Sequence, residues 1–203
     1  MKDATNKMMN KKVMNKKILQ QRLDEILPKL QSDEFLNNKG LGNEIGFYIF
    51  DYPAQSELQV REHIEFLVEK LNNRGIQFIH INIFTVIIEL LRSRNLEQKA
   101  FDIQKKKGSA ALLKALKGPL DQKRLADFMS KKAEPEKQQF ILLSGLGNSW
   151  PLIRGHSLLN ALHSLMKDTP LVLFYPGKYN GTELHPFGRI DSANYYRAFS
   201  LVS

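Results

Sequence analysis

The chain has 203 residues, a formal net charge of +9 at pH 7 and no cysteine. This length suits one ordinary domain with a core of its own, and the lack of cysteine excludes disulfides and thiolate metal sites. No apolar run approaches the roughly 20 residues of a membrane-spanning helix. Because the lysine-containing N-terminus also lacks the apolar run of a secretory signal, we expect a cytoplasmic protein that does not bind a membrane.

The positive charge is concentrated in two segments. Residues 1–17 carry six lysines against one aspartate, and residues 99–137 carry eleven Lys and Arg against five Asp and Glu. Such segments can contact nucleic acid or an acidic partner, although a solubilising tail and a solvated helix face give the same pattern. Aromatic residues do not alternate with these lysines, so a stacking platform for single strands is not indicated.

The first part of the chain predicts a tail, a helix, a strand and a second helix. Residues 1–17 are polar and rich in Met, Asn and Lys, which favours disorder. Apolar residues spaced by three and four from Ile18 predict a helix that Pro28 kinks or closes. The apolar run Gly46–Pro53 is typical of a strand buried on both faces. A capping box at Ser56 then predicts the start of an amphipathic helix.

The middle of the chain predicts a second strand and several helices. In the segment Ile76–Phe84, isoleucines alternate with other residues, as in a strand. A helix over about 85–94 follows directly. The basic segment then predicts a helical insertion over about 95–135, which is broken at Gly108 and again at Gly118.

The last part predicts two more buried strands, Gln139–Leu146 and Pro170–Gly177, separated by a helix that begins at Pro151, and then an edge strand over Asn194–Val202. Strands that alternate with helices are typical of parallel sheets with right-handed crossovers. We therefore predict a three-layer α/β domain over 18–203. Its mainly parallel sheet has four to five strands, and the helical insertion lies between the second and third strands.

The carboxyl ends of parallel strands meet at one edge of a sheet, where open α/β sheets bind ligands. We expect that edge to collect Asp51, Asn82, the glycine-rich turn 144–148 and the segment 175–178. Arg154 should lean over the edge from a helix start, which suits an anion.

An exposed tryptophan beside this turn also suits a protein partner. The alternative is that the glycines only make a tight corner. The candidate docking or anion-binding residues are Gly145, Gly147, Asn148, Trp150, Arg154 and His156, with Asn194, Tyr195, Arg197 and Phe199 from the C-terminal segment.

Complete catalytic motifs do not occur. Trp150 stands where a P-loop or a dinucleotide fingerprint that starts at Gly145 needs glycine. No serine is flanked by glycines as in a nucleophile elbow, and the histidines lack metal-ligand spacing. The one nuclease-like pattern is Glu97 with Lys99, for which Asp51 is the only plausible acidic partner. We therefore predict a non-catalytic protein without a metal or cofactor.

Four segments in chain order carry a family resemblance. They are "GLGNEIGFYIFDYP", "LSGLGNSWPLIRGHSLLNAL", "PLVLFYPGKYNG" and "FGRIDSANYYRAF". They resemble the BrxB family, a domain of unknown function from bacteriophage-exclusion (BREX) defence systems, and the resemblance runs from about Ile18 to Val202. The family typically has an aromatic residue before the proline and then Ile-Arg-Ser-His. Here Trp150 supplies the aromatic residue, and Gly155 stands where the serine is usual.

The resemblance implies a small accessory subunit with no assigned catalysis. Its partners would be a site-specific DNA methyltransferase, a large ATPase and PglZ, an alkaline-phosphatase-like protein.

Three functions stay open at this point. The first is docking to another BREX protein through the surface around Trp150. The second is nucleic-acid binding, for which the candidate contacts are Lys105, Lys106, Lys107, Lys114, Lys117, Lys123 and Arg124. The third is a metal-dependent nuclease around Asp51. Steep salt dependence would separate the second function from the first.

Overall fold

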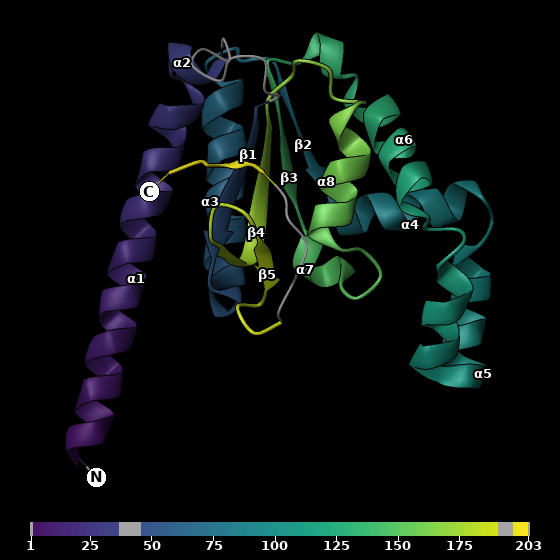
Figure 1. Ribbon diagram of the computed structural model, residues 1–203, viewed down its shortest axis with the longest axis horizontal. Helices are drawn as coiled ribbons and strands as arrows, with labels where there is room; N and C mark the ends of the chain where they lie inside the picture. The colour runs from purple at the N-terminus through teal and green to yellow at the C-terminus, as the bar shows by residue number, and fades with distance from the viewer. Residues whose placement is uncertain (1, 37–45, 191–196, 203) are drawn as a thin grey trace.

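The computed structural model describes residues 2–36, 46–190 and 197–202. It has the three layers that the sequence predicts, with a central sheet between two layers of helices (Figure 1). Helices α1 (Lys2–Leu30) and α3 (Glu57–Asn72) cover one face. Helices α4 (Ile83–Ser93), α6 (Gln122–Ala133) and α8 (Gly155–His163) cover the other face.

The sheet is mainly parallel and follows the order β2-β3-β4-β1-β6. Its strands are β1 (Phe47–Tyr52), β2 (Phe78–Asn82), β3 (Phe140–Ser144), β4 (Leu171–Tyr179) and β6 (Phe199–Ser200). Every pairing along this path is parallel. The predicted buried strands are confirmed, and the predicted C-terminal edge strand is present as the two residues of β6 beside β1.

A sixth strand was not predicted. β5 (Leu184–Pro186) pairs antiparallel with the end of β4. The turn between them begins at Asn180, whose side-chain oxygen accepts hydrogen bonds from the backbone N–H groups of Thr182 and Glu183. An Asn-Gly pair at such a turn is the usual sequence signal of a hairpin, and this chain carries it at Asn180 and Gly181.

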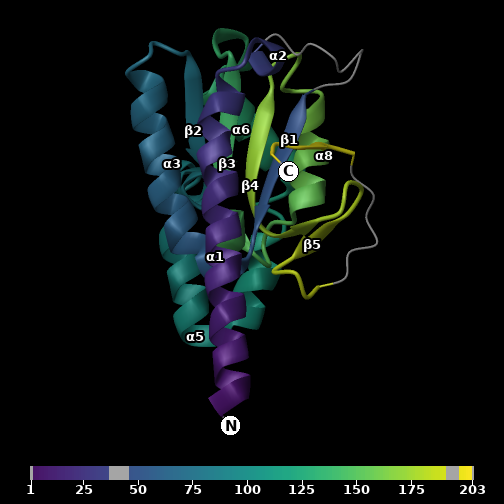
Figure 2. The ribbon, with the colours of Figure 1, turned by 90° about the vertical axis from the view of Figure 1, so that its left-hand side faces the viewer.

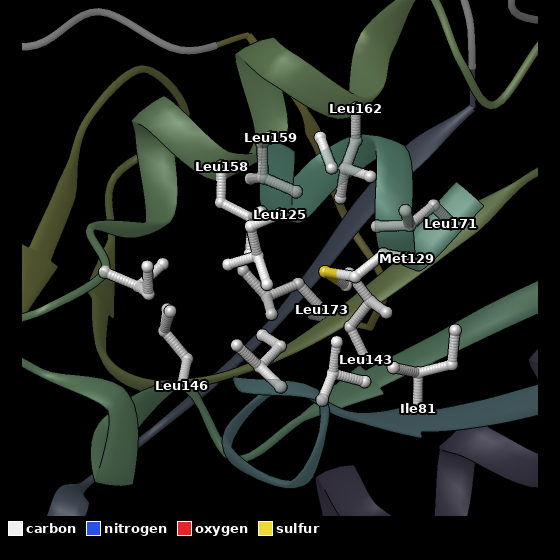
Figure 3. Packing of buried hydrophobic residues seen from close by; sticks show 14 of the residues in the cluster. Ile81, Leu125, Met129, Leu143, Leu146, Leu158, Leu159, Leu162, Leu171 and Leu173 are labelled. Carbon is white, nitrogen blue, oxygen red and sulfur yellow. The ribbon is translucent and has the colours of Figure 1, made fainter. Parts of the chain in front are cut away.

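Alternate side chains of β1 enter two separate cores. Phe47 and Ile49 pack with the layer of α4, α6 and α8, whereas Tyr48 and Phe50 pack with α1 and α3. This burial on both faces is what the continuous apolar run predicts. Figure 3 shows the first core, where leucines of α8 and residues of α6 meet Ile81 and the leucines of β3 and β4. Fully burying each such leucine contributes about 1.5–3 kcal/mol.

Helix α1 is longer than predicted. The sequence predicts disorder over residues 1–17, but α1 spans Lys2–Leu30, and its N-terminal half extends beyond the other two layers (Figures 1 and 2). No proline or glycine precedes Pro28, and Lys, Met and Ala favour the helix. A helix nucleated by the buried residues Leu19 and Leu23 can therefore propagate toward the N-terminus.

One helix start lacks its predicted capping contact, and another differs from the prediction in position. Ser56 stands before α3, but its side chain makes no capping hydrogen bond, and a 3₁₀ turn over Ala54–Ser56 leads into the helix instead. The helix after β3 does not begin at Pro151. A short helix, α7 (Leu146–Ser149), comes first, the Trp150–Pro151 peptide bond is cis, and α8 starts only at Gly155.

The remaining elements are α2 (Asp33–Leu36), a 3₁₀ turn over Pro135–Lys137 and the insertion helix α5 (Glu97–Leu116). α5 projects from the outer side of the second helix layer (Figure 1). As predicted, it is interrupted at Gly108, whose φ and ψ are 76° and −180°. Of the helices that the structure describes, none has both the length and the apolar character needed to cross a membrane.

Candidate functional site

The predicted edge of the sheet is assembled by the strand register. Asp51 at the end of β1 pairs with Tyr175 of β4, and Asn82 at the end of β2 pairs with Ser144 of β3. The structure thus gathers these side chains at the carboxyl ends of the strands, as expected for a parallel sheet.

The glycine turn makes a tight corner at this edge. Gly145 has φ 75°, and a Cβ atom on it would lie 2.4 Å from the side-chain oxygen of Asn82. That oxygen accepts a hydrogen bond from Thr85 N at 3.2 Å and caps α4. Ser149 Oγ donates to Gly145 O at 2.9 Å and fixes the other side of the corner. Only glycine fits such a close approach at positive φ, so the corner alone accounts for Gly145.

Trp150 stands on the outer side of this corner. Its side chain is 41% exposed, and its ring meets the ring of Phe187 edge-on at 5.7 Å between centroids. A shallow pocket beside it is lined by Gly147, Pro176 and Phe187, among others. Asn148, next in the turn, is exposed. Trp150 is therefore a large aromatic side chain in a mostly apolar depression that solvent reaches.

Arg154 and His156 lie where α8 begins. Arg154 is the residue before the first turn of α8, is exposed, and forms no ion pair with any described residue. His156 Nε2 shares a hydrogen bond of 2.8 Å with Ser157 Oγ. Burial and then the charge of Arg154 lower the pKa of His156, so this imidazole is neutral near pH 7. The cation at this position is Arg154.

Tyr175 lies behind this surface. Its side chain is 2% exposed, and its hydroxyl has no hydrogen-bond partner among the described residues. A Cβ atom on Gly155 would come within 3.5 Å of the Tyr175 ring. Burial, followed by the negative charge of Asp51, raises the pKa of Tyr175, so it remains a neutral phenol.

Of the four C-terminal candidates, the structure describes Arg197 and Phe199. Asn194 and Tyr195 lie outside the described residues. Phe199 packs against the core on the α1 and α3 face, where its ring is 5.8 Å from that of Tyr48. Arg197 is exposed in the segment before β6. The structure therefore separates Phe199 from the surface around Trp150, because β6 joins the sheet next to β1, away from β3.

The predicted nucleic-acid contacts are all exposed. They lie on α5, after α5 and on the first turn of α6, at Lys105, Lys106, Lys107, Lys114, Lys117, Lys123 and Arg124. The break at Gly108 divides them, because three precede it on α5 and four follow it. Arg124 also donates to Gly118 O at 3.2 Å.

The residues of the nuclease-like pattern are engaged elsewhere. Asp51 Oδ1 accepts from Arg22 Nη2 at 2.8 Å, and Asp51 Oδ2 accepts from Tyr179 N at 3.1 Å. Glu97 forms an ion pair with Arg92 at 2.8 Å. Over residues 2–36, 46–190 and 197–202, no group of three or more Asp, Glu, His or Cys side chains is placed to hold a metal ion.

Arg22 was not predicted as a site residue, and it also lies over the Phe50 ring at 4.9 Å. The available signal was an arginine within the apolar spacing of α1.

A groove beside the Trp150 corner was not predicted from the sequence. It lies between α5, the turn that leads to α6 and the loop before α8, and has a volume of about 470 Å³. Arg154 lines this groove as well as the pocket beside Trp150. The groove and the pocket are therefore adjacent parts of one surface.

Comparison with known proteins identifies the family. A family model described as "BREX protein BrxB" matches residues 79–201. A "BREX protein BrxB" of Escherichia coli O9:H4 (strain HS) is 49% identical over 181 residues, which cover 89% of this chain and 90% of the relative. A protein of the same name from Bacillus cereus (strain H3081.97) is 42% identical over 187 residues, which cover 90% of this chain and 96% of the relative.

No solved structure matches the chain. The family match covers the described strands from β2 to β6, except the first residue of β2, and includes the insertion and the Trp150 corner. The two relatives extend the similarity over most of the chain. The chain belongs to the BrxB family of BREX proteins.

Proposed function

We propose that this BREX-system component is a non-catalytic accessory subunit that acts by docking another protein of the system. The observation that carries the proposal is Trp150, which is 41% exposed and lies beside an arginine without an ion-pair partner among the described residues. Tryptophan and arginine are the residues most enriched in the hot spots of protein interfaces. Both side chains follow the tight corner that Gly145 makes against Asn82.

The candidate partners are the BREX proteins that the family resemblance implies: PglZ, the large ATPase and the DNA methyltransferase. A docking surface centred on a desolvated tryptophan should hold its partner at high salt, because burial of apolar area is not screened by ions. A complex held mainly through phosphate contacts should instead dissociate steeply as the salt concentration rises.

The test is affinity purification of the tagged chain, co-expressed with the other BREX proteins and treated with nuclease, at low and high salt. We expect one protein to be recovered in stoichiometric amount at both salt concentrations. Trp150→Ala should reduce its recovery at least about tenfold, as removal of a hot-spot side chain does.

Phe66→Ala is the matched control, because Phe66 is 42% exposed on α3 at the opposite layer. It should leave recovery unchanged. Full assembly of the Trp150→Ala protein, with its thermal unfolding unaltered, would reject docking at this surface.

A second candidate function is nucleic-acid binding, which is favoured by the exposure of all seven predicted Lys and Arg contacts on and after α5. Its test is the affinity of the purified chain for a DNA duplex at several salt concentrations. Each phosphate contact adds about −0.9 to the slope of log affinity against log salt. Reversing the charges of Lys105 to Lys107 should flatten the slope by two to three such increments if DNA is the ligand.

A further inference from the structure

The groove beside α5 has an apolar floor. It is lined by Leu113, Leu116, Leu120 and Leu152, with Lys117, Asp121, Gln122, Pro151 and Arg154 around them. Leu116 and Leu120 are 6% and 3% exposed and belong to the main core, whereas Leu113 and Leu152 are half-buried in the walls. The groove thus exposes part of the core's edge to solvent. It lies between residues 113–122 and residues 151–154, which are far apart in the sequence.

The charge of its lining is positive on balance, with two cations against one carboxylate. Lys117 and Arg154 stand at the groove, are exposed, and form no ion pair with any described residue. The one carboxylate that lines it, Asp121, caps the start of α6, where its Oδ1 accepts hydrogen bonds from Lys123 N at 3.2 Å and Arg124 N at 3.4 Å, and forms no ion pair with either cation. An occupant of this groove therefore gains from negative charge as well as from apolar side chains.

We propose that the groove binds an acidic amphipathic segment of the partner protein. Its apolar side chains would pack on the four leucines, and its carboxylates would face Lys117 and Arg154. The inference rests on the proposed docking function and deepens it. Because Arg154 also lines the pocket beside Trp150, Lys117, Arg154 and the tryptophan belong to one docking surface, on which both cations serve a protein ligand.

A nucleic acid fits this groove less well. Single-stranded chains stack their bases on aromatic side chains, and the groove lining contains none. Duplex DNA is held mainly by donors to phosphate, whereas four of the nine lining residues are leucines. A peptide segment with apolar residues on one side and carboxylates at its margins can pack on the leucines and also pair with Lys117 and Arg154.

The first experiment places the photoreactive residue p-benzoylphenylalanine at position 113 of the full chain, in cells that express the complete BREX system. Leu58 is the control position, because it is a leucine that is 72% exposed on α3, in the other helix layer. We expect position 113, and not position 58, to cross-link to one BREX protein. Mass spectrometry should identify a peptide with net negative charge and apolar residues spaced by three and four.

Cross-linking to nucleic acid, to a neutral or basic peptide, or at no more than the level of position 58 would overturn the inference.

Charge reversal gives an independent test. Lys117→Glu should weaken binding of the purified partner about tenfold or more, because it places a like charge against the segment. Lys99→Glu, on α5 but outside the groove lining, should change binding less than twofold. Replacing an acidic residue of the cross-linked peptide by lysine should restore binding to the Lys117→Glu chain. Equal losses from both reversals would indicate a general electrostatic field and would count against the groove.

These outcomes separate the inference from the proposed function. If Trp150→Ala abolishes assembly while Lys117→Glu and position 113 have no effect, docking stands and the groove is not its site. If Trp150→Ala leaves assembly complete, the docking proposal itself fails.

Discussion

Asp51 illustrates how a residue that looks chemical in sequence can be structural. Arg22 of α1 donates to its side chain at 2.8 Å and to its backbone oxygen at 2.8 Å, and Tyr179 N donates to the second carboxylate oxygen. The pair is partly buried, with side-chain exposures of 19% for Arg22 and 24% for Asp51. It ties α1 to the ends of β1 and β4, which is reason enough for a carboxylate at this position.

Replacing Asp51 by alanine should therefore destabilise the fold. The change leaves the Arg22 guanidinium partly buried without its carboxylate, which we expect to cost about 1–3 kcal/mol of unfolding free energy. Urea denaturation measures this loss. Asp127→Ala, at an exposed position of α6, should stay within about 0.5 kcal/mol of the parent chain. An unchanged midpoint for Asp51→Ala would show that the ion pair contributes nothing.

Removing the hydroxyl group should affect stability differently at two tyrosines of β4. The Tyr175 hydroxyl is buried without a partner, whereas the Tyr179 hydroxyl accepts from Ala198 N at 2.9 Å and lies within 2.8 Å of the Ala198 carbonyl oxygen. Tyr175→Phe should leave stability equal or raise it by about 1 kcal/mol, and Tyr179→Phe should lower it by about 1–2 kcal/mol. Thermal unfolding of the two variants compares them directly. A clear loss for Tyr175→Phe would contradict this account.

At the scale of elements, the break in α5 determines how the insertion presents its side chains. Residues on both sides of Gly108 are helical, but Gly108 itself has φ 76° and ψ −180°, a conformation that is essentially restricted to glycine. A Cβ atom at this position would meet nothing within 4 Å. The kink is therefore maintained by backbone conformation and not by packing around the glycine.

Gly108→Ala should straighten α5. Alanine disfavours the kinked conformation and gains about 1 kcal/mol over glycine in a helix. Because the chain has no cysteine, spin labels at Lys99→Cys and Lys117→Cys report one distance without further changes. The separation should lengthen toward the roughly 27 Å of axial rise in a continuous helix. An unaltered distance distribution would mean that tertiary contacts, and not Gly108, fix the kink.

Elements with strong local patterns could be predicted, and those fixed by distant contacts could not. The apolar run Gly46–Pro53 locates β1 within one residue of Phe47–Tyr52, because burial on both faces demands such a run. The helix start at Pro151 was wrong, since proline suits a helix start and a turn equally well. For the hairpin to β5, the signal at Asn180 was present but was not used.

For the site, the parallel direction of the strands was enough to predict which residues meet at the sheet edge. Its details depend on contacts that no local pattern records. Arg22 and Asp51 are 29 residues apart, and no sequence pattern in either segment predicts that the two side chains form an ion pair. The groove arises from the direction in which α5 leaves its break relative to the Trp150 corner. Residue spacing predicts a kink at Gly108 but not its direction.

For the whole molecule, three partly buried histidines predict how stability depends on pH. Burial lowers the pKa of His63, His80 and His156 below the ordinary value of 6.5. As the pH falls through about 6.5, the unfolded chain binds protons that the folded chain does not, and each such proton costs about 1.4 kcal/mol per pH unit. The stabilisation is therefore complete above about pH 7 and is lost toward acid.

The urea concentration at the unfolding midpoint should accordingly decrease as the pH is lowered from 7.5 to 5.5. His80→Gln should reduce this fall, because it removes one of the three imidazoles whose pKa burial lowers. In the parent chain, His80 Nε2 lies 2.8 Å from Ser144 Oγ at the contact of β2 with β3. A midpoint that is constant or rises over this interval would contradict the sign of these shifts.

The sheet order has a consequence for how the chain reaches its folded state. β2, β3 and β4 are neighbours in both sequence and space, but β1 lies between β4 and β6, with Phe47 beside Leu171 and Tyr48 beside Phe199. Such long-range closure is slow to form. We expect the strongly apolar β1 segment to stay unpaired during folding until β4 has formed. Until β1 pairs with it, the edge of β4 can pair with other chains. The yield of refolded protein should therefore fall as the protein concentration rises. It should increase with a chaperone that binds the unpaired β1 segment.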